Sequence, residues 1–249
     1  DFGDAEAEHP DCLLLVGPDP RPRAVAMDDL CAASTQGEWT GVANRLSAAH
    51  RAWPAIEDAA HAARKPRTPP TVPVMPDSAP THGVATTDEP AADIIRQRRS
   101  AQSFDPRINA PLQAFSNCVA SLSPVGTPWD ALPWSPLVHP VFIVHRVEGL
   151  TPGLYALPRS PDAIDGLRAA MSPAFAWELV EETAGVPLYL LQEGDGRAAM
   201  KMISCHQDIA GDSAFTLGML AEFEPVLRER GAWWYRRLFW ECGVLGQRL

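Results

Sequence analysis

Three arginines fall within four residues of this chain and are followed directly by a hydroxyl group. Arg96, Arg98, Arg99 and Ser100 lie in the segment 94–104, IIRQRRSAQSF. Guanidinium groups bind oxyanions through paired N–H donors, so the pattern is typical of a phosphate-binding site. The formal net charge of the chain is −10, so this positive cluster stands against an acidic background. The alternative is an exposed helix with solvated arginines, which is equally common, and the pattern alone does not decide between the two.

Other residues that could act as nucleophiles or metal ligands form weaker patterns. The sequence Gly211-Asp212-Ser213 precedes an apolar run rather than a helix, so we interpret it as the start of a strand and not as a nucleophile turn. Adjacent Cys205 and His206 have poor spacing for a metal, and we expect a core thiol with a polar neighbour.

Two histidines, His139 and His145, lie on one side of an expected strand. At a rise of about 3.3 Å per residue they are roughly 20 Å apart, which excludes a shared metal. We therefore predict no metal site. The sequence also has no glycine-rich dinucleotide or P-loop motif.

Composition narrows the class of protein. The acidic balance argues against sequence-independent binding of nucleic acid, which needs a basic footprint. No apolar run approaches the ~20 residues of a membrane span. The five cysteines are scattered and odd in number, which favours free thiols in a reducing cytoplasm.

The arginine segment needs supporting elements, and hydrophobic spacing predicts several of them. A capping box at Thr86 and Glu89 indicates a helix over 91–99 that buries Ile94 and Ile95 and presents the arginines at its end. Periodicity or apolar runs predict the remaining elements: helices over 28–33, 48–63, 110–122, 161–171, 173–182 and 231–249, and strands over 11–16, 137–147, 153–157, 186–192 and 213–223.

These elements predict an α+β domain. Strands 137–147 and 153–157 form a hairpin, whereas the nearly continuous apolar run 213–223 indicates a central strand buried on both faces. The last helix is apolar on most sides, which is typical of a helix in a core or a subunit interface. Residues 65–87 are rich in proline and are expected to be a linker.

The arginine segment resembles the opening motif of the nitroreductase family, Arg-Arg-Ser-x-Arg-x-Phe. Three further stretches agree in order: 147–155, VEGLTPGLY, which is similar to the SagB-type branch that includes azoline dehydrogenases; 208–210, DIA; and Tyr235-Arg236 followed by 241–247, ECGVLGQ. The resemblance covers about residues 88–249. It implies a nitroreductase-like fold, with a central, mostly antiparallel sheet flanked by helices and a long buried interface helix.

This resemblance implies an FMN-dependent oxidoreductase that carries out two-electron oxidation or reduction of a peptide-derived or small organic substrate. By position, Arg98, Arg99, Ser100 and Gln102 are the candidate cofactor-binding residues, for the phosphate and ribityl chain of FMN. Gln102 replaces the second basic residue of the motif, so part of the phosphate charge is unmatched.

Two other departures affect the site. The loop that the family writes PSAG or PSGGN is 123–126, SPVG, here, and a tryptophan-rich insert follows it. The Lys-Tyr pair associated with azoline oxidation falls on Glu229-Arg230, so no catalytic acid or base is assigned. The alternative function is a degenerate, non-catalytic half that completes a partner domain's flavin site or binds a peptide.

The resemblance also implies a tandem arrangement. Residues 9–17, HPDCLLLVG, resemble the end of a preceding nitroreductase domain. We therefore expect 1–64 to be the C-terminal tail of such a domain plus a helix, 65–87 to be the linker, and 88–249 to be a second, C-terminally incomplete domain. The expected partner is a second nitroreductase-like domain or a homodimer subunit.

Overall fold

In the computed structural model, the chain divides into two compact units, Asp1–Val74 and Met75–Leu249. The structure describes residues 26–41, 51, 53–67, 88–126, 128–183 and 185–249. The strand expected over 11–16, residues Thr86 and Cys12, and most of the proposed linker lie outside the described residues. The domain boundaries proposed from the sequence therefore stay a prediction.

The first unit contains two described helices, α1 (Met27–Gln36) and α2 (Pro54–Ala62). The helix expected at 28–33 is confirmed in α1, whereas the helix expected over 48–63 begins only at Pro54. Trp53 is its non-helical N-cap. The physical reason is Pro54, which fits the first helical turn but disfavours helical geometry in the residue before it.

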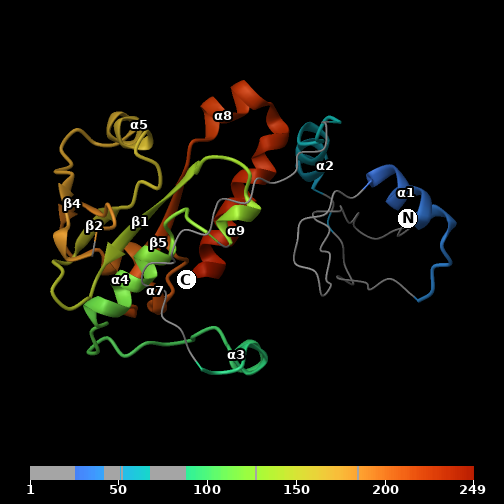
Figure 1. The fold of residues 1–249 in the computed structure, drawn as a ribbon. Coiled ribbons are helices and arrows are strands. Elements are labelled where there is room, and N and C mark those ends of the chain that lie inside the picture. Colours follow the sequence, from blue (N-terminus) through green and yellow to red (C-terminus); the bar gives the residue numbers. More distant parts are fainter. Residues whose placement is uncertain (1–25, 42–50, 52, 68–87, 127, 184) are drawn as a thin grey trace. The chain divides into compact units, whose positions relative to one another are not determined.

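The second unit is an α+β domain around one antiparallel sheet of five strands (Figure 1). The strand order is β3-β4-β2-β1-β5. The bounds are β1 (Val138–Val144), β2 (Gly153–Ala156), β3 (Glu178–Leu179), β4 (Tyr189–Glu193) and β5 (Phe215–Ala221). The described helices are α3 (Ala91–Gln97), α4 (Leu112–Ser121), α5 (Ala163–Ala170), α6 (Arg197–Ile203), α7 (Asp208–Asp212), α8 (Phe223–Arg230) and α9 (Tyr235–Arg248), with short 3₁₀ turns at Trp129–Ala131, Glu181–Thr183 and Ala232–Trp234.

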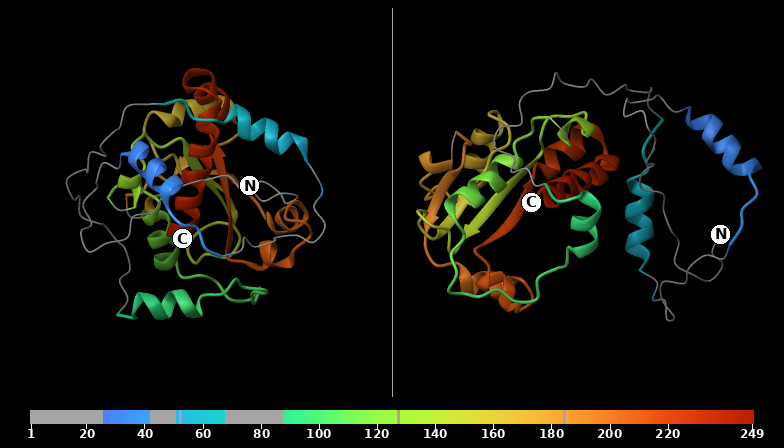
Figure 2. Two further views of the ribbon diagram at one scale, coloured as in Figure 1. Left: turned by 90° about the vertical axis from the view of Figure 1, so that its right-hand side faces the viewer. Right: turned by 60° about the horizontal axis from the view of Figure 1, so that its bottom comes forward.

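One face of the sheet is covered by α4 and α9 (Figures 1 and 2). Phe115 of α4, Phe142 of β1 and Phe215 of β5 meet edge to face, with ring centroids 5.2 to 5.8 Å apart. The hydroxyl of Ser121 donates to the carbonyl of Arg248 at 3.4 Å, which joins the ends of the two helices. The helices predicted over 110–122 and 231–249 are thereby confirmed, but α9 buries one stripe and not most of its sides, since Phe239 is 60% exposed.

The predicted hairpin of β1 and β2 is also confirmed, with Phe142 opposite Tyr155. Gly149 lies in its connection with φ +77°, a conformation that costs a glycine little because it has no Cβ. Tyr155 is fully buried, and its hydroxyl donates to the carbonyl of Thr151 at 2.6 Å. Burial raises the pKa of Tyr155 to about 12, so this phenol is a structural donor at neutral pH.

Two predictions about the sheet are wrong. Residues 173–182 form no α-helix: Trp177 has φ +55°, Glu178–Leu179 pairs with β4 as an edge strand, and only a 3₁₀ turn begins at Glu181. A short isolated helix is marginal in water, so pairing with an existing strand prevails. Strand β5 is not central, because within the described residues it pairs only with β1 and its side chains are half-buried or exposed.

Two surface predictions are also wrong. Ile94 and Ile95 of α3 were expected to be buried, but Ile95 is 74% exposed, and no residue of α3 is buried. Cys205 was expected in the core, but both it and His206 are exposed, with φ near +60°. Cys31, Cys118, Cys205 and Cys242 are free thiols, as expected.

The α9 core contact gives a test of the fold. Leu245 is fully buried between helix and sheet. Leu245→Ala should lower the free energy of unfolding by about 2–5 kcal/mol, because it loses apolar burial and leaves a cavity. The exposed Gln247→Ala on the same helix should change it by less than about 0.5 kcal/mol. Urea denaturation measures both, and equal effects would contradict this placement of α9.

Candidate functional site

The four predicted cofactor-binding residues lie together on the exposed segment that follows α3. Arg98 is the C-cap of that helix, with extended backbone (φ −61°, ψ 130°), and the chain continues without regular structure through Gln102. The Arg99 guanidinium folds back and donates to the carbonyls of Arg96 at 2.6 Å and Arg98 at 2.8 Å. Arg99 thus satisfies carbonyl groups at the helix end that lack an intrahelical hydrogen-bond donor.

Several surface arginines have a carboxylate partner, but Arg98 and Arg99 have none among the described residues. Arg96 lies 3.6 Å from Asp93, Arg107 lies 2.7 Å from Asp105, and Arg197 lies 2.6 Å from Asp195. In the part of the chain that the structure describes, no carboxylate comes within 4.0 Å of Arg98 or Arg99. Two positive charges therefore remain available to an external anion.

The donor set fits part of an FMN molecule. Two guanidinium groups match a phosphate, and the Ser100 hydroxyl and Gln102 amide match the hydroxyl groups of a ribityl chain. Within the described residues, no hydrogen bond or ion pair connects these four side chains to the sheet. These donors match only the polar end of the cofactor and do not by themselves define a site for the flavin ring.

At two other positions where the sequence departs from the family pattern, the side chains make structural contacts. The insert after 123–126 contains the buried Trp129, whose ring lies 4.2 Å beneath the Arg159 guanidinium carbon. At the end of α8, the Arg230 guanidinium carbon lies 4.4 Å from the ring centroid of Trp234. Neither position supplies a proton donor or acceptor that is aimed into the arginine segment.

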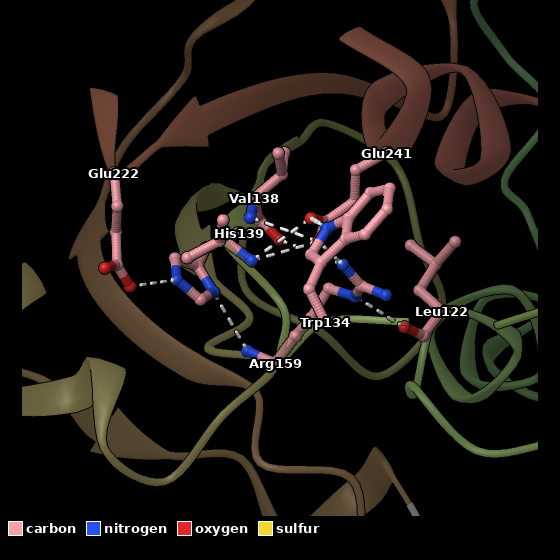
Figure 3. Close-up of polar contacts among 8 residues, drawn as sticks. Leu122, Trp134, Val138, His139, Arg159, Glu222 and Glu241 are labelled. Atoms are coloured by element: carbon pink, nitrogen blue, oxygen red, sulfur yellow. Dashed lines mark hydrogen bonds and ion pairs between the residues drawn. The ribbon is translucent and has the colours of Figure 1, made fainter. Parts of the chain in front are cut away.

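The most deeply buried charges belong to a pair that the sequence did not single out (Figure 3). Arg159, just after β2, forms an ion pair with Glu241 of α9, and both side chains are 1% exposed. Glu241 also accepts hydrogen bonds from the backbone N–H groups of Leu137 and Val138 and from the indole of Trp134, all at 3.2 Å. Arg159 donates to the carbonyls of Leu122 at 2.9 Å and Val138 at 3.2 Å.

A signal for this pair was present in the last helix. Trp234, Leu238, Glu241 and Leu245 recur at helical spacing, and the carboxylate occupies a position on the buried stripe of α9. A charge on an apolar stripe requires a partner, because an unpaired buried charge is too costly. The identity of that partner, 82 positions earlier in the chain, has no local signature.

His139 extends this network toward the opposite face of the sheet. The backbone N–H of Arg159 donates to its Nδ1 at 3.2 Å, and its Nε2 lies 3.1 Å from Glu222 Oε1. Because a backbone N–H can only donate, the neutral ring carries its proton on Nε2 and donates it to Glu222. Burial lowers the pKa of His139 and outweighs the opposing effect of Glu222, so the contact is a hydrogen bond of a neutral ring at pH 7.

His145 has separate partners, namely the carbonyl of Ala210 at 3.1 Å and the hydroxyl of Thr216 at 3.3 Å. Within the described residues, no group of three or more histidines, cysteines and carboxylates could hold a metal ion. The same residues include no helix that is both long and apolar enough to cross a membrane.

The chain matches none of the protein families compared and none of the curated proteins compared. Among solved structures, it is similar to the crystal structure of a candidate nitroreductase from Anabaena variabilis, with a TM-score of 0.46 and 17% sequence identity. The match covers 63% of this chain and 28% of that chain, so this chain spans less than a third of the length of the protein it resembles.

The buried ion pair leads to a stability prediction. Glu241→Gln should lower the free energy of unfolding by about 3–5 kcal/mol, because it leaves Arg159 buried without its counter-charge. Glu224→Gln removes the exposed partner of Arg228 and should cost at most about 1 kcal/mol. Denaturant unfolding of both variants distinguishes the two cases. A cost for Glu241→Gln no larger than that of the control would show that the pair does not stabilise the fold.

His139 leads to a prediction about pH. Its pKa is lowered in the folded state, so the unfolded chain binds more protons as the pH falls below about 6.5, and stability then declines by at most about 1.4 kcal/mol per pH unit. Above that pH the contribution is fully present. His139→Asn keeps an acceptor for the Arg159 N–H and should flatten the decline between pH 7.5 and 5.5.

The control for this experiment is the exposed His206→Asn, which should keep the slope of the wild type. Thermal or urea unfolding across the pH range measures the slopes. If His139→Asn leaves the slope unchanged, a different group is responsible for the loss of stability.

Proposed function

We propose that this chain is part of an FMN-dependent oxidoreductase of the nitroreductase type, with the SagB-like branch as the nearest resemblance. The observation that carries the proposal is the pair of exposed guanidinium groups, Arg98 and Arg99, which lack a carboxylate partner among the described residues of a chain with net charge −10. In an acidic protein, an unpaired double charge next to a hydroxyl favours an external phosphate.

The roles of the four residues follow from their chemistry. Arg98, whose side chain has no partner in the described part of the chain, binds the phosphate through its planar fork. Arg99 adds charge while its Nη1 holds the helix end. Ser100 and Gln102 orient the ribityl hydroxyl groups. Because Gln102 is neutral where the family motif has a basic residue, the phosphate is bound more weakly than it would be with a third cation.

When bound, FMN supplies the two-electron chemistry, and the protein supplies orientation and electrostatics. The substrate class that we propose is a peptide-derived or small organic molecule. The described residues assign no catalytic acid or base, because the positions where the branch carries Lys-Tyr are Glu229 and Arg230 here.

A second nitroreductase-like domain or a second subunit would complete the flavin site. Support comes from an exposed aromatic row on α8 and α9, where Phe223, Tyr235 and Phe239 contact one another edge to face at 4.9 and 5.8 Å. Phe239 is 60% exposed, although Leu238, Glu241 and Leu245 of the same helix are buried. A partner that covers this row would bury the remaining side of α9.

The alternative function is a non-catalytic half that completes a partner domain's flavin site or binds a peptide. The observation that favours it is Arg230, which stacks on Trp234 and lies 3.9 Å from Glu229. A Glu-Arg pair engaged in this way cannot replace the proton-transfer function of Lys-Tyr.

Flavin content decides between the two functions. Purified full-length protein should be yellow or accept added FMN, and Arg98→Ala should raise the dissociation constant of FMN roughly ten- to hundredfold, since a charge-assisted hydrogen bond is lost. Absorbance at the flavin band and fluorescence titration provide the cofactor-to-chain ratio and the affinity.

Arg96→Ala is the matched control, because Arg96 already pairs with Asp93 and should change the affinity little. A colourless protein that takes up no FMN would overturn the first function and leave the second. Equal affinities of the Arg98→Ala and Arg96→Ala variants would show that Arg98 does not bind the phosphate.

A further inference from the structure

A second group of arginines lies among tryptophans, away from the segment that follows α3 in the sequence. The cluster consists of Arg230, Arg237, Trp134, Trp233 and Trp234, which we call the tryptophan–arginine cluster. The Arg237 guanidinium carbon lies 4.9, 4.6 and 4.5 Å from the ring centroids of Trp134, Trp233 and Trp234, in that order. Arg230 lies 4.4 Å from the Trp234 centroid. One guanidinium is thus held against three indole rings.

The backbone makes this arrangement possible at the turn between α8 and α9. Gly231 ends α8 with φ +91°, and a Cβ there would lie 3.1 Å from the Trp233 ring. The chain can therefore reverse tightly enough to bring Arg230 onto Trp234. Trp134 comes from the distant insert before β1 and is fixed by its hydrogen bond to Glu241.

Stacking occupies the faces of the two guanidinium groups and leaves their N–H edges for other partners. The Nε of Arg237 is buried without a hydrogen-bond partner, and the described residues place no carboxylate within ion-pair distance of this arginine. Arg230 has Glu229 at 3.9 Å, which is too long for a hydrogen bond. Both groups thus retain donors that the described residues do not satisfy.

The carboxylate of Glu241 cannot neutralise the positive charge of Arg237. Glu241 contacts Trp134, but its oxygens already accept from Arg159 and from two backbone N–H groups. Burial and the charge of Arg230 both lower the pKa of Arg237, which shows that the two cations are close enough to repel. Arg230 has only the long contact to Glu229, and Arg237 has no carboxylate partner among the described residues, so an anion that joins the two guanidinium groups would relieve their repulsion.

We infer that the tryptophan–arginine cluster binds the carboxylate of an aromatic or similarly flat organic acid. The guanidinium N–H groups would donate to the carboxylate, and the half-buried indole rings of Trp134 and Trp233 would contact the apolar body of the ligand. Arg230 and Arg237 are half-buried, so part of each side chain is reachable from solvent, although the Nε of Arg237 is not. The inference uses none of the proposed flavin-binding residues and does not depend on the proposed function.

The test uses benzoate as the probe. Isothermal titration should detect saturable binding of benzoate, and the tryptophan fluorescence should change along the same isotherm because three indole rings line the cluster. Benzamide, which has the same ring without the charge, should not bind measurably. Inorganic phosphate titrated into the Arg98→Ala variant, which lacks the proposed flavin-phosphate contact, should bind at least about tenfold more weakly than benzoate, because it lacks the apolar body.

Variants locate the site. Arg237→Gln should weaken benzoate binding by at least about tenfold. Arg237→Lys keeps the charge but loses the planar fork, and its affinity should lie between those of wild type and Arg237→Gln. Arg228→Gln, an exposed arginine of α8 that pairs with Glu224, is the matched control and should bind like wild type, as should Arg98→Ala.

Circular dichroism and thermal unfolding first establish that each variant is folded. If Arg237→Gln is unfolded, Arg230→Gln takes its place and should also lose at least about fivefold in affinity. The inference is overturned if benzoate does not bind, if benzamide binds equally well, or if the folded variants keep wild-type affinity. Saturable phosphate binding without benzoate binding would also overturn it, because the ligand class would then be a phosphate.

Discussion

The buried ion pair of Arg159 and Glu241 is the contact on which the second unit depends. It joins the end of α4 through the Leu122 carbonyl and the start of β1 through the Leu137 and Val138 N–H groups. Removing two charges from water is expensive, and the extra hydrogen bonds offset that cost only when every donor and acceptor is in place. The pair therefore specifies one arrangement of helix and sheet more than it adds net stability.

The same carboxylate links the scaffold to the tryptophan–arginine cluster. Glu241 holds the Trp134 indole, and Trp134 packs edge to face on Trp234 at 5.6 Å. The aromatic surface around Arg237 is thus positioned by the core. The proposed flavin-binding segment differs, because Arg98 and Arg99 lie on one exposed stretch and their side chains make no hydrogen bond to the sheet within the described residues.

Predictions from the sequence were accurate where local spacing determines the outcome. The apolar face of α4, the hairpin of β1 and β2, and the buried stripe of α9 follow from periods of 3.6 and 2, which depend only on neighbouring residues. Predictions failed where a distant element competes. Residues 173–182 pair with β4 instead of forming a short helix, and the apolar run of β5 lies at an edge of the described sheet.

The sequence alone determined the chemistry of the arginine segment, because Arg98, Arg99, Ser100 and Gln102 are contiguous and their donors need no folding to be near one another. The burial of Glu241 on the apolar stripe of α9 was not predicted from the sequence. Only the tertiary structure decided that the partner is Arg159, and that Trp134 meets Trp234 and Arg237 some hundred residues later in the chain. The physical reason is that buried charges and stacked rings are satisfied by contacts in space, which strand order and helix packing establish without a local pattern.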